Sequence, residues 1–448
     1  MNITQEFETI AAISTPLGTG GVGVIRISGD RSFEIIKKLS KKTNIQVGKI
    51  CHGWIFDEET KVDEVIILPF KSPNSYTGED VIEIQCHGGV QVVKNILKVV
   101  LKNGARMAER GEFTKRAFLN HKLDLSQAEA VDDLIHSKTS NFAFQSAKNL
   151  SGVLATKTKE IKSELFVVAS KIVAGIDFPE DVAEPEYSYL LEQFQLVLSK
   201  INNILKYSKS SDILRQGIKV AIVGQPNVGK SSLFNTLLKL DRAIVTDIAG
   251  TTRDIIQENI DMGVAVTLID TAGIREDEDI DKVEQIGITY SKQSAQNADL
   301  VLFMYDASVG LTNGDKTIYS SIKDKQHIVI ANKVDKLETD FNEELENTFK
   351  ISVLNEINVD ELRNKIQNTV CDFSVEDMEF VTNERQQDCL TRCKLALERA
   401  IEACKMKELQ DMIYIDVKEA LLSLDEITGE VINDEILANI FEHFCIGK

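Results

Sequence analysis

Residues 224–231 read GQPNVGKS and match the pattern G-x-x-x-x-G-K-[ST]. Glycines at these positions let backbone N–H groups close around phosphate oxygens, and a helix that starts there adds the positive end of its dipole. The apolar run IKVAIVG precedes the pattern and the amphipathic run SLFNTLLK follows it. This strand–loop–helix context predicts a nucleoside triphosphate site rather than a plain Gly-rich turn. We assign its phosphate contacts to Asn227, Val228, Gly229, Lys230, Ser231 and Ser232, with the Ser231 hydroxyl as a Mg²⁺ ligand.

Two further elements follow in the order that a GTP site requires. The strand-like run AVTLID ends in DTAG, where an Asp can hold the Mg²⁺ hydration shell and a Gly N–H can meet the γ-phosphate. The run HIVIAN ends in NKVD, whose Asp can accept two hydrogen bonds from guanine; adenine would leave that carboxylate unpaired. We therefore predict GTP rather than ATP. The residues assigned here are Asp270, Thr271, Ala272, Gly273, Asn332, Lys333 and Asp335.

Residues 246–254, between these elements, have the composition of a switch loop. A Thr in such a loop can be the second Mg²⁺ ligand, and we choose Thr252 for this role. Residues 351–353, ISV, only approximate the last base-contacting loop of GTPases.

The residue that would orient the attacking water is not obvious. Ras-like GTPases carry a Gln after the D-x-x-G element, whereas this chain has Ile274, which cannot orient water. Either hydrolysis is negligible or another group supplies the polarity. Glu284, in the acid-rich segment REDEDIDKVEQ, is a candidate. The alternative is that this charge run is a solvated face.

Three kinds of residue pattern divide the chain into segments. Short β-branched runs with Gly-rich turns fill residues 1–120 and predict an α+β domain with a largely antiparallel sheet. Helical periodicity marks 121–215 and 374–448, and strand–helix alternation at 216–373 predicts a parallel, doubly wound sheet. We expect a multidomain α/β and α protein in which a Ras-like P-loop domain is inserted between two halves of a helical domain.

Composition narrows the class of protein. At 448 residues, 43% hydrophobic and 27% charged, the chain is in the globular range. Its net charge is −19, and residues 1–120 hold 16 Lys and Arg against 14 Asp and Glu, so we expect any nucleic acid to be bound locally or through a partner. No apolar run approaches the roughly 20 residues of a membrane span, and the seven cysteines form no metal-binding pattern. We expect a cytoplasmic protein with reduced thiols.

The whole chain resembles the MnmE (TrmE) family of tRNA-modification GTPases. The segments GTGGVGVIRISG, PNSYTGEDVIEIQCHGG and GEFTKRAFLNHKLDLSQAEAV look like that family's folate-binding domain and the start of its helical domain. The final CIGK resembles the family's C-terminal signature. The resemblance implies that residues 1–120 are a folate-binding and dimerisation domain.

The resemblance also implies K⁺-dependent GTP hydrolysis by G domains that dimerise across the nucleotide. A monovalent cation can offset charge that develops on the phosphates. The family's water-orienting glutamate corresponds to Glu284. The K⁺ ligands correspond to Asn227, Thr246, Ile248 and Thr251, and Thr246 and Thr251 also join the GTP-binding set.

In the N-terminal part, the resemblance implies that Arg26, Glu83, Lys122 and Lys448 contact a ligand of the 5-formyltetrahydrofolate type, with Cys445 as a catalytic thiol. With a flavin-dependent, MnmG-like partner, such a homodimer would form 5-carboxymethylaminomethyl- or aminomethyluridine at the tRNA wobble position. Two alternatives stay open. One is a ribosome-assembly GTPase without modification chemistry, and the other is a folate enzyme with a vestigial G domain.

Overall fold

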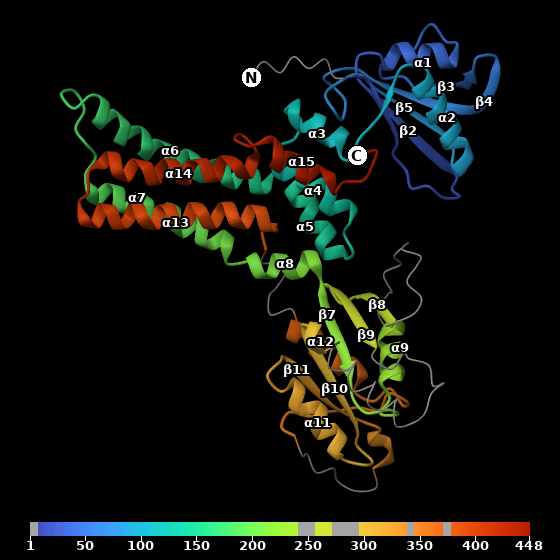
Figure 1. Cartoon of the computed structure of the whole chain (residues 1–448), viewed down its shortest axis with the longest axis vertical. Coiled ribbons are helices and arrows are strands. Elements are labelled where there is room, and N and C mark those ends of the chain that lie inside the picture. Colours follow the sequence, from blue (N-terminus) through green and yellow to red (C-terminus); the bar gives the residue numbers. More distant parts are fainter. Residues whose placement is uncertain (1–7, 241–255, 271–294, 338–344, 371–377) are drawn as a thin grey trace. The chain divides into compact units, whose positions relative to one another are not determined.

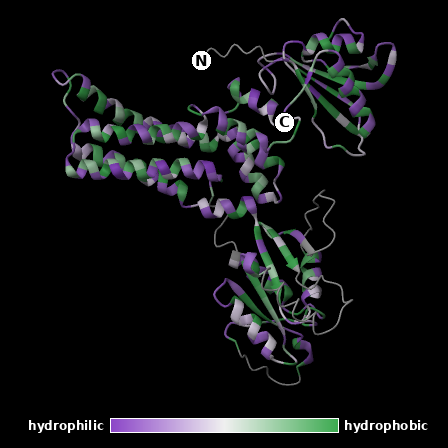
Figure 2. Cartoon of the chain, viewed as in Figure 1, coloured by the Kyte–Doolittle hydropathy of each residue, from purple (hydrophilic) through white to green (hydrophobic). Residues whose placement is uncertain are grey.

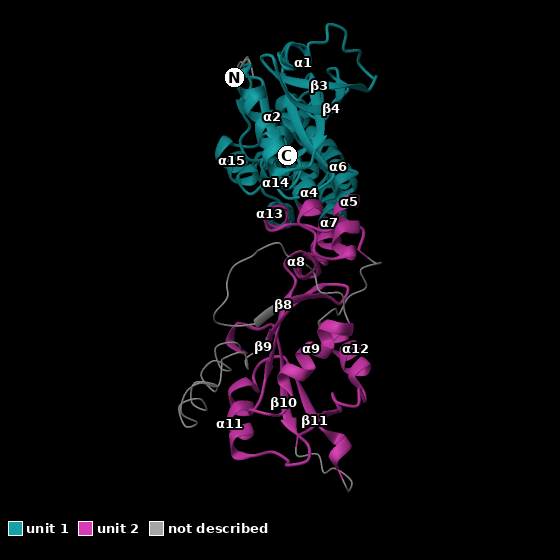
Figure 3. Cartoon of the chain, turned by 90° about the vertical axis from the view of Figure 1, so that its right-hand side faces the viewer, with its two compact units in different colours: residues 1–132, 149–198, 389–448 teal, residues 133–148, 199–388 magenta. Residues whose placement is uncertain are grey.

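The computed structural model describes residues 8–240, 256–270, 295–337, 345–370 and 378–448. The chain forms two compact units, each built from separate stretches of sequence (Figure 3). Unit 1 comprises residues 1–132, 149–198 and 389–448, and unit 2 comprises residues 133–148 and 199–388. Within the described part of the chain, no helix is both long and apolar enough to cross a membrane.

Unit 1 begins with a six-stranded sheet of order β3-β4-β5-β2-β1-β6, in which only the β1–β6 pair is parallel. The predicted, largely antiparallel sheet is therefore confirmed. Helices α1 (Ser32–Ser40) and α2 (Val90–Lys102) share one core with alternate strand residues such as Ile25 and Ile27. The strands are β1 (Ile10–Ile13), β2 (Val22–Ser28), β3 (Cys51–Asp57), β4 (Thr60–Phe70), β5 (Val81–His87) and β6 (Arg106–Met107).

The period-2 alternation of strands sends intervening residues to the other face of this sheet. There Ile10 and Ala12 of β1 pack with Phe113 of α3 (Glu112–Leu119). Arg26 lies between Ile25 and Ile27 on β2, and Glu83 lies between Ile82 and Ile84 on β5. Arg26 and Glu83 therefore lie on the face that α3 approaches.

Long helices complete unit 1, with α6 lying beside α14 (Figure 1). Leu154 and Ile172 lie on the buried face of α6, and Leu390 and Cys404 lie on that of α13, in agreement with the helical periodicity predicted for 121–215 and 374–448. A loop that contains Pro179 and Pro185 separates α6 from α7. The helices are α4 (Leu125–Ile135), α5 (Ser140–Leu150), α6 (Val153–Asp177), α7 (Tyr187–Leu205), α13 (Glu384–Met406), α14 (Gln410–Thr428) and α15 (Asp434–Glu442).

Unit 2 contains a second six-stranded sheet, of order β12-β11-β10-β7-β9-β8. Its pairs are parallel except β8–β9, an antiparallel edge that the sequence pattern did not reveal. Apolar residues concentrate in its strands (Figure 2), and two cores, one on each face, confirm the doubly wound prediction. The strands are β7 (Ile218–Val223), β8 (Ile256–Asp261), β9 (Ala265–Asp270), β10 (Leu300–Asp306), β11 (His327–Asn332) and β12 (Phe349–Lys350).

Four α-helices and a 3₁₀-helix are described in unit 2 outside α4, α5, α7 and α13, which cross the boundary between the units. They are α8 (Ser208–Gln216), α9 (Lys230–Leu240), α11 (Asn313–Ile322), α12 (Val359–Val370) and η1 (Val334–Lys336). Because the loops after β7, β10 and β11 follow the carboxyl ends of neighbouring parallel strands, they meet at one edge of the sheet, which is where doubly wound folds bind ligands.

Candidate functional site

The predicted phosphate loop runs from the end of β7 to the start of α9. Gly224 has φ 157° and Gly229 has φ 105°. A Cβ at Gly224 would lie 2.0 Å from the Met304 carbonyl oxygen, and one at Gly229 would lie 2.4 Å from Asn332 Nδ2. Glycine is therefore favoured at both positions, by a strand carbonyl at Gly224 and by the Asn332 amide at Gly229, and the positive φ favours it at both. Asn227 also has a positive φ, 64°, as a tight loop of this kind demands.

Lys230 is buried at the first residue of α9, and its Nζ donates hydrogen bonds to the Gly224 and Gln225 carbonyls at 3.0 and 2.9 Å. The ammonium group thus lies inside the curve of the loop. Ser231 and Ser232 follow on the first turn of α9 and are exposed. This donor set, a cation and hydroxyls at a helix N-terminus, fits a triphosphate with its Mg²⁺.

Residues of the NKVD segment tie the base-binding region to the phosphate loop. Asn332 Nδ2 donates to the Val228 carbonyl at 2.8 Å, and Asn332 Oδ1 accepts from the Val353 N–H at 3.1 Å. Lys333 Nζ donates to the Asn227 carbonyl and to Asp306 Oδ2, both at 2.7 Å. The end of β11 is thereby bonded to the phosphate loop, to the end of β10 and to the loop at Val353. The sequence pattern gives only the order of these segments along the chain.

Asp306, which the sequence pattern did not single out, is the carboxylate partner of Lys333 at this site. Burial would raise the pKa of Asp306, but Lys333 and the Ser308 hydroxyl and N–H outweigh it, so that pKa is lowered. The available signal was its position at the end of β10, which neighbours both β7 and β11.

Asp335 and Asp270 occupy the expected ends of their segments. Asp335 lies on η1, is exposed, and has no hydrogen-bond partner among the described residues, so its carboxylate can accept from a base. Asp270 ends β9 opposite Ile222 of β7, two residues before the phosphate loop. Its side chain, and the residues Thr246, Ile248, Thr251, Thr252, Thr271, Ala272, Gly273 and Glu284, lie outside the described part of the chain.

A second cluster lies on the N-terminal sheet of unit 1. Arg26 and Glu83 are direct cross-strand partners, and Arg26 Nε donates to Glu83 Oε1 at 2.9 Å. The Arg26 guanidinium also lies 5.1 Å from the Tyr76 ring centre and 5.6 Å from that of Phe113. Its Nη1 is buried and has no hydrogen-bond partner among the described residues. An unsatisfied guanidinium nitrogen beside a carboxylate and two rings fits a flat, polar heterocycle such as a pterin.

The C-terminal residues join this cluster through the backbone. Gly111 and Phe113 donate their N–H groups to the carbonyls of Cys445 and Lys448 at 3.4 and 3.2 Å. The Ser14 hydroxyl donates to the Gly447 carbonyl at 3.2 Å. Gly447 has φ 98°, and a Cβ there would lie 2.3 Å from the Ile13 carbonyl oxygen.

The side chain of Lys448 shares the surroundings of Arg26. Burial lowers the pKa of Lys448 and the charge of Arg26 lowers it further, whereas Glu83 and Cys445 act in the opposite direction. Phe113 gives the geometric link, because its N–H binds the Lys448 carbonyl and its ring lies 5.6 Å from the Arg26 guanidinium. The Cys445 residue is exposed, unlike the buried cysteines of α13.

Lys122 is less closely associated with Arg26 and Glu83 than the C-terminal residues are. Its Nζ donates to the Pro73 carbonyl at 3.1 Å, in the loop that carries Tyr76. No contact among the described residues joins Lys122 to Arg26, Glu83 or Lys448.

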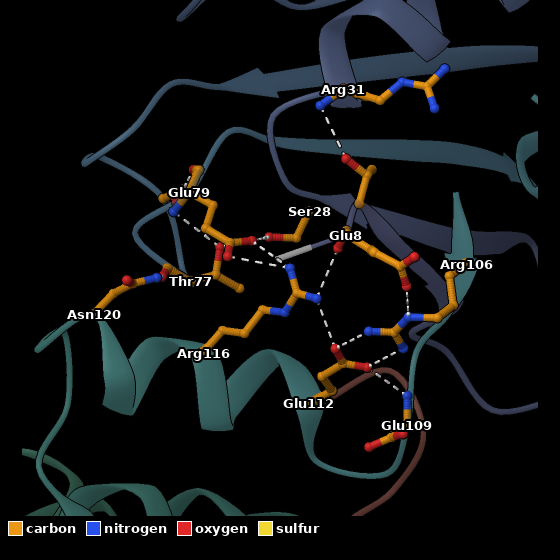
Figure 4. Close-up of polar contacts among 12 residues, drawn as sticks. Glu8, Ser28, Arg31, Thr77, Glu79, Arg106, Glu109, Glu112, Arg116 and Asn120 are labelled. Carbon is orange, nitrogen blue, oxygen red and sulfur yellow. Dashed lines mark hydrogen bonds and ion pairs between the residues drawn. The ribbon is translucent and has the colours of Figure 1, made fainter. Parts of the chain in front are cut away.

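A buried ionic network anchors α3 beneath this cluster. Figure 4 shows Arg116 pointing from α3 toward the carboxylates of Glu79 and Glu112, with which it makes hydrogen bonds of 2.8–3.2 Å. Arg106 binds the same Glu112 carboxylate through both Nη atoms, at 2.9 and 2.7 Å. Burial would raise the Glu112 pKa, but Arg106, the Glu109 N–H and Arg116 lower it to about 2. Glu112 is therefore ionised at neutral pH and fixes the helix that holds the tail.

Three features define a P-loop protein of the GTPase class: the largely parallel sheet of unit 2, its glycine-dependent phosphate loop and the Asn332–Asp335 segment. Two family models match the chain: "GTP-binding protein TrmE N-terminus" over residues 9–122 and "MnmE helical domain" over residues 125–445. The chain belongs to the MnmE family of tRNA modification GTPases.

Curated relatives match along the whole chain. The tRNA modification GTPase MnmE of Thermoanaerobacter pseudethanolicus is 44% identical over 460 residues, covering 99% of this chain and 100% of the relative. That of Pseudothermotoga lettingae is 42% identical over 451 residues, covering 98% and 100%. Among solved structures, a variant of Aquifex aeolicus Era bound to GDP and AlF₄⁻ is 34% identical over 40% of this chain and 66% of its own, with a TM-score of 0.28. The G domain of T. maritima FeoB is 25% identical over 34% of this chain and 99% of its own, with a TM-score of 0.26.

Proposed function

We propose that this chain hydrolyses GTP in unit 2 and uses a folate bound on unit 1 to modify the wobble uridine of tRNA at C5. The product would be a 5-carboxymethylaminomethyl or aminomethyl uridine. The observation that carries the proposal is the Arg26–Glu83 pair with its unsatisfied guanidinium nitrogen, next to Phe113, whose N–H binds the C-terminal Lys448 carbonyl. Family membership supports the substrate class, because the relatives bear the name tRNA modification GTPase.

On the nucleotide, we assign Lys230 to the phosphates, Asp335 to guanine, and Ser231 and Thr252 to Mg²⁺. Asn227 would provide the side-chain ligand of K⁺, with backbone groups of Thr246, Ile248 and Thr251. Such a cation would offset charge that develops on the phosphates. Glu284 would orient the attacking water. The left-handed backbone of Asn227 and the inward-facing Lys230 support this arrangement.

On the folate, Glu83 would accept hydrogen bonds from the pterin edge while Arg26 Nη1 donates to an acceptor. Lys448 and Lys122 would bind the anionic tail. A 5-formyltetrahydrofolate or related folate would supply the one-carbon unit. Cys445 would act as the catalytic thiol, because its exposure leaves the sulfur open to substrate.

We infer that the protein works as a homodimer in the cytoplasm and with a flavin-dependent, MnmG-like partner. We also propose functional domains at 1–120, 121–215, 216–373 and 374–448, in which the second and fourth segments form one helical domain. The net charge of −19 supports a division of labour in which the partner binds most of the tRNA backbone.

Nucleoside mass spectrometry of total tRNA tests the modification. Cells that lack the gene should lose C5-aminomethylated uridines, and the wild-type gene should restore them while Cys445→Ser should not. Cys51→Ser, a partly exposed thiol on β3, is the matched control and should restore them fully. Restoration by Cys445→Ser would remove the thiol from the mechanism. Uridines that never change would favour the ribosome-assembly alternative.

GTP turnover tests the hydrolytic part separately. We expect turnover by the purified protein to rise when Na⁺ is replaced by K⁺ at constant ionic strength, and Glu284→Ala to abolish the rise. Nucleotide affinity should stay unchanged in Glu284→Ala, because Glu284 is proposed to orient the attacking water and not to bind the nucleotide. Equal turnover in both salts would overturn the K⁺ assignment.

A further inference from the structure

One end of the helical bundle carries an apolar groove that the proposed function leaves without a role. The groove, of about 690 Å³, lies between α6 and the segment that enters α7. It is lined by Phe166, Val167, Ala174, Val182, Pro185 and Tyr189, among others. Phe166 is 58% exposed and Val167 is 51% exposed, although both lie in the middle of a long helix.

The groove continues onto a second loop. Tyr187 donates its hydroxyl to the Glu408 carbonyl at 2.8 Å, and Gln410 Nε2 donates to the Pro185 carbonyl at 2.7 Å. The α6–α7 and α13–α14 loops therefore lie side by side at the end of the bundle away from α15 (Figure 1). Met406 at the end of α13 and Leu409 in the second loop are 71% and 73% exposed. Exposed apolar side chains concentrated in neighbouring segments mark an interaction site on a globular protein.

The loop that borders the groove is acidic. The loop at 177–186 reads DFPEDVAEPE and contains five acidic residues and no basic one. All five are exposed, and within the described part of the chain none of them forms an ion pair. Lys171 also lines the groove, but its ammonium group is turned onto Tyr189, 4.2 Å from the ring centre. The groove is therefore an apolar surface with an acidic rim.

The apolar groove and its acidic rim together indicate which kind of molecule can bind there. RNA phosphates would be repelled by the acidic rim. A second copy of the same end would bring two acidic loops together in an isologous contact, which is unfavourable as well. Apolar side chains flanked by Lys and Arg satisfy both features, and an amphipathic helix can lay such a face into a groove.

We propose that this end of the bundle, the groove between α6 and α7 with its acidic loop, docks a basic amphipathic segment of a second protein. The inference rests on the proposed function, because the flavin-dependent partner named there is the protein that would contribute the segment. None of the residues that line the groove belongs to the folate cluster or to the phosphate loop.

The test is the affinity of the full-length chain for the purified flavin-dependent partner, measured by isothermal titration calorimetry at two salt concentrations. Phe166→Ser with Val182→Ser should weaken binding at least about tenfold, because two exposed apolar anchors are lost. Glu180→Lys with Asp181→Lys should weaken binding by a similar factor and flatten its salt dependence. Basal GTP turnover should be unchanged in both, which shows that the variants are folded.

Matched variants lie on unit 2. Leu354→Ser removes an apolar side chain that is 81% exposed, and Glu346→Lys with Glu356→Lys reverses two exposed charges. Both should bind the partner as the wild type does. Wild-type affinity in the groove variants would overturn the docking site and leave the proposed function intact. If the wild-type chain does not bind the partner at all, both the docking site and the complex in the proposed function are wrong. If the groove variants lose self-association instead, the occupant is a second copy and the proposal fails.

Discussion

The backbone N–H of Phe113, in the first turn of α3, donates a hydrogen bond to the carbonyl oxygen of Lys448 at 3.2 Å. The Phe113 ring also faces the Arg26 guanidinium at 5.6 Å. One residue thus both borders the proposed folate cluster and holds the residues that bring Cys445 to it. The buried contacts of Arg116 and Glu112 keep that helix in place. Changes in α3 or in the tail should therefore affect the modification while GTP turnover persists.

Gly447→Ala should displace the tail. The added Cβ would lie 2.3 Å from the Ile13 carbonyl oxygen, and φ of 98° is unfavourable for alanine. We expect loss of C5-aminomethylated uridine in tRNA and weaker folate binding, with basal GTP turnover retained. Nucleoside mass spectrometry and a fluorescence titration with folate measure these effects. Ile446→Ala, at a side chain that is 52% exposed, is the control and should behave as wild type.

Asp306→Ala should weaken nucleotide binding, although Asp306 is not among the residues predicted to contact the nucleotide. The substitution frees Lys333 Nζ from its 2.7 Å ion pair and leaves it one partner, the Asn227 carbonyl. Loss of a hydrogen bond to a charged group predicts an affinity for GDP about tenfold lower. Fluorescent GDP binding measures it, with Asp324→Ala as an exposed control. An unchanged affinity would show that Lys333 is positioned without Asp306.

Asp335→Asn should exchange the base preference. The carboxylate is predicted to accept from guanine N1–H and the exocyclic amine, whereas an amide can donate to the 2-oxo group of xanthine. We expect GTP affinity to fall at least about 100-fold, because buried polar groups of the base lose their partners, and XTP to bind more tightly than GTP. Competition against fluorescent GDP or XDP gives both values. Retention of GTP preference would place guanine recognition elsewhere.

The pKa of Glu112 predicts a pH-dependent stability of unit 1. Because its folded-state pKa of about 2 lies below the ordinary value of 4.5, Glu112 stabilises fully above pH 4.5, and this contribution is lost as the pH falls toward about 2. Glu112→Gln should lower the opening free energy of α3 by about 3 kcal/mol at pH 7, and the difference from wild type should shrink below pH 4.5. Hydrogen exchange of α3 amides measures it. The exposed control Glu109→Gln should change little, and a pH-independent difference would refute the assignment.

The amino-acid sequence determined what depends on neighbours along the chain. The phosphate loop needed glycines at 224 and 229, and both are held where a Cβ would collide with another strand end. The sequence also predicts the apolar faces of α6 and α13 and the alternation of β2 and β5, because local periodicity decides which side of an element is apolar. The antiparallel edge strand β8 was not, since pairing direction is a property of two strands and not of one.

Only the tertiary structure decided which distant residues share a site. The family resemblance groups Arg26, Glu83, Lys122 and Lys448. In the structure, sheet register places Arg26 against Glu83, and the C-terminal segment brings Lys448 to the same helix, α3. Lys122 instead donates a hydrogen bond to the Pro73 carbonyl. Asp306 and Lys333 meet because β10 and β11 run parallel and end at one edge. Such contacts are set by strand order and by the return of the chain, which depend on the packing of whole cores. No local pattern encodes them, because each one is a consequence of the whole fold.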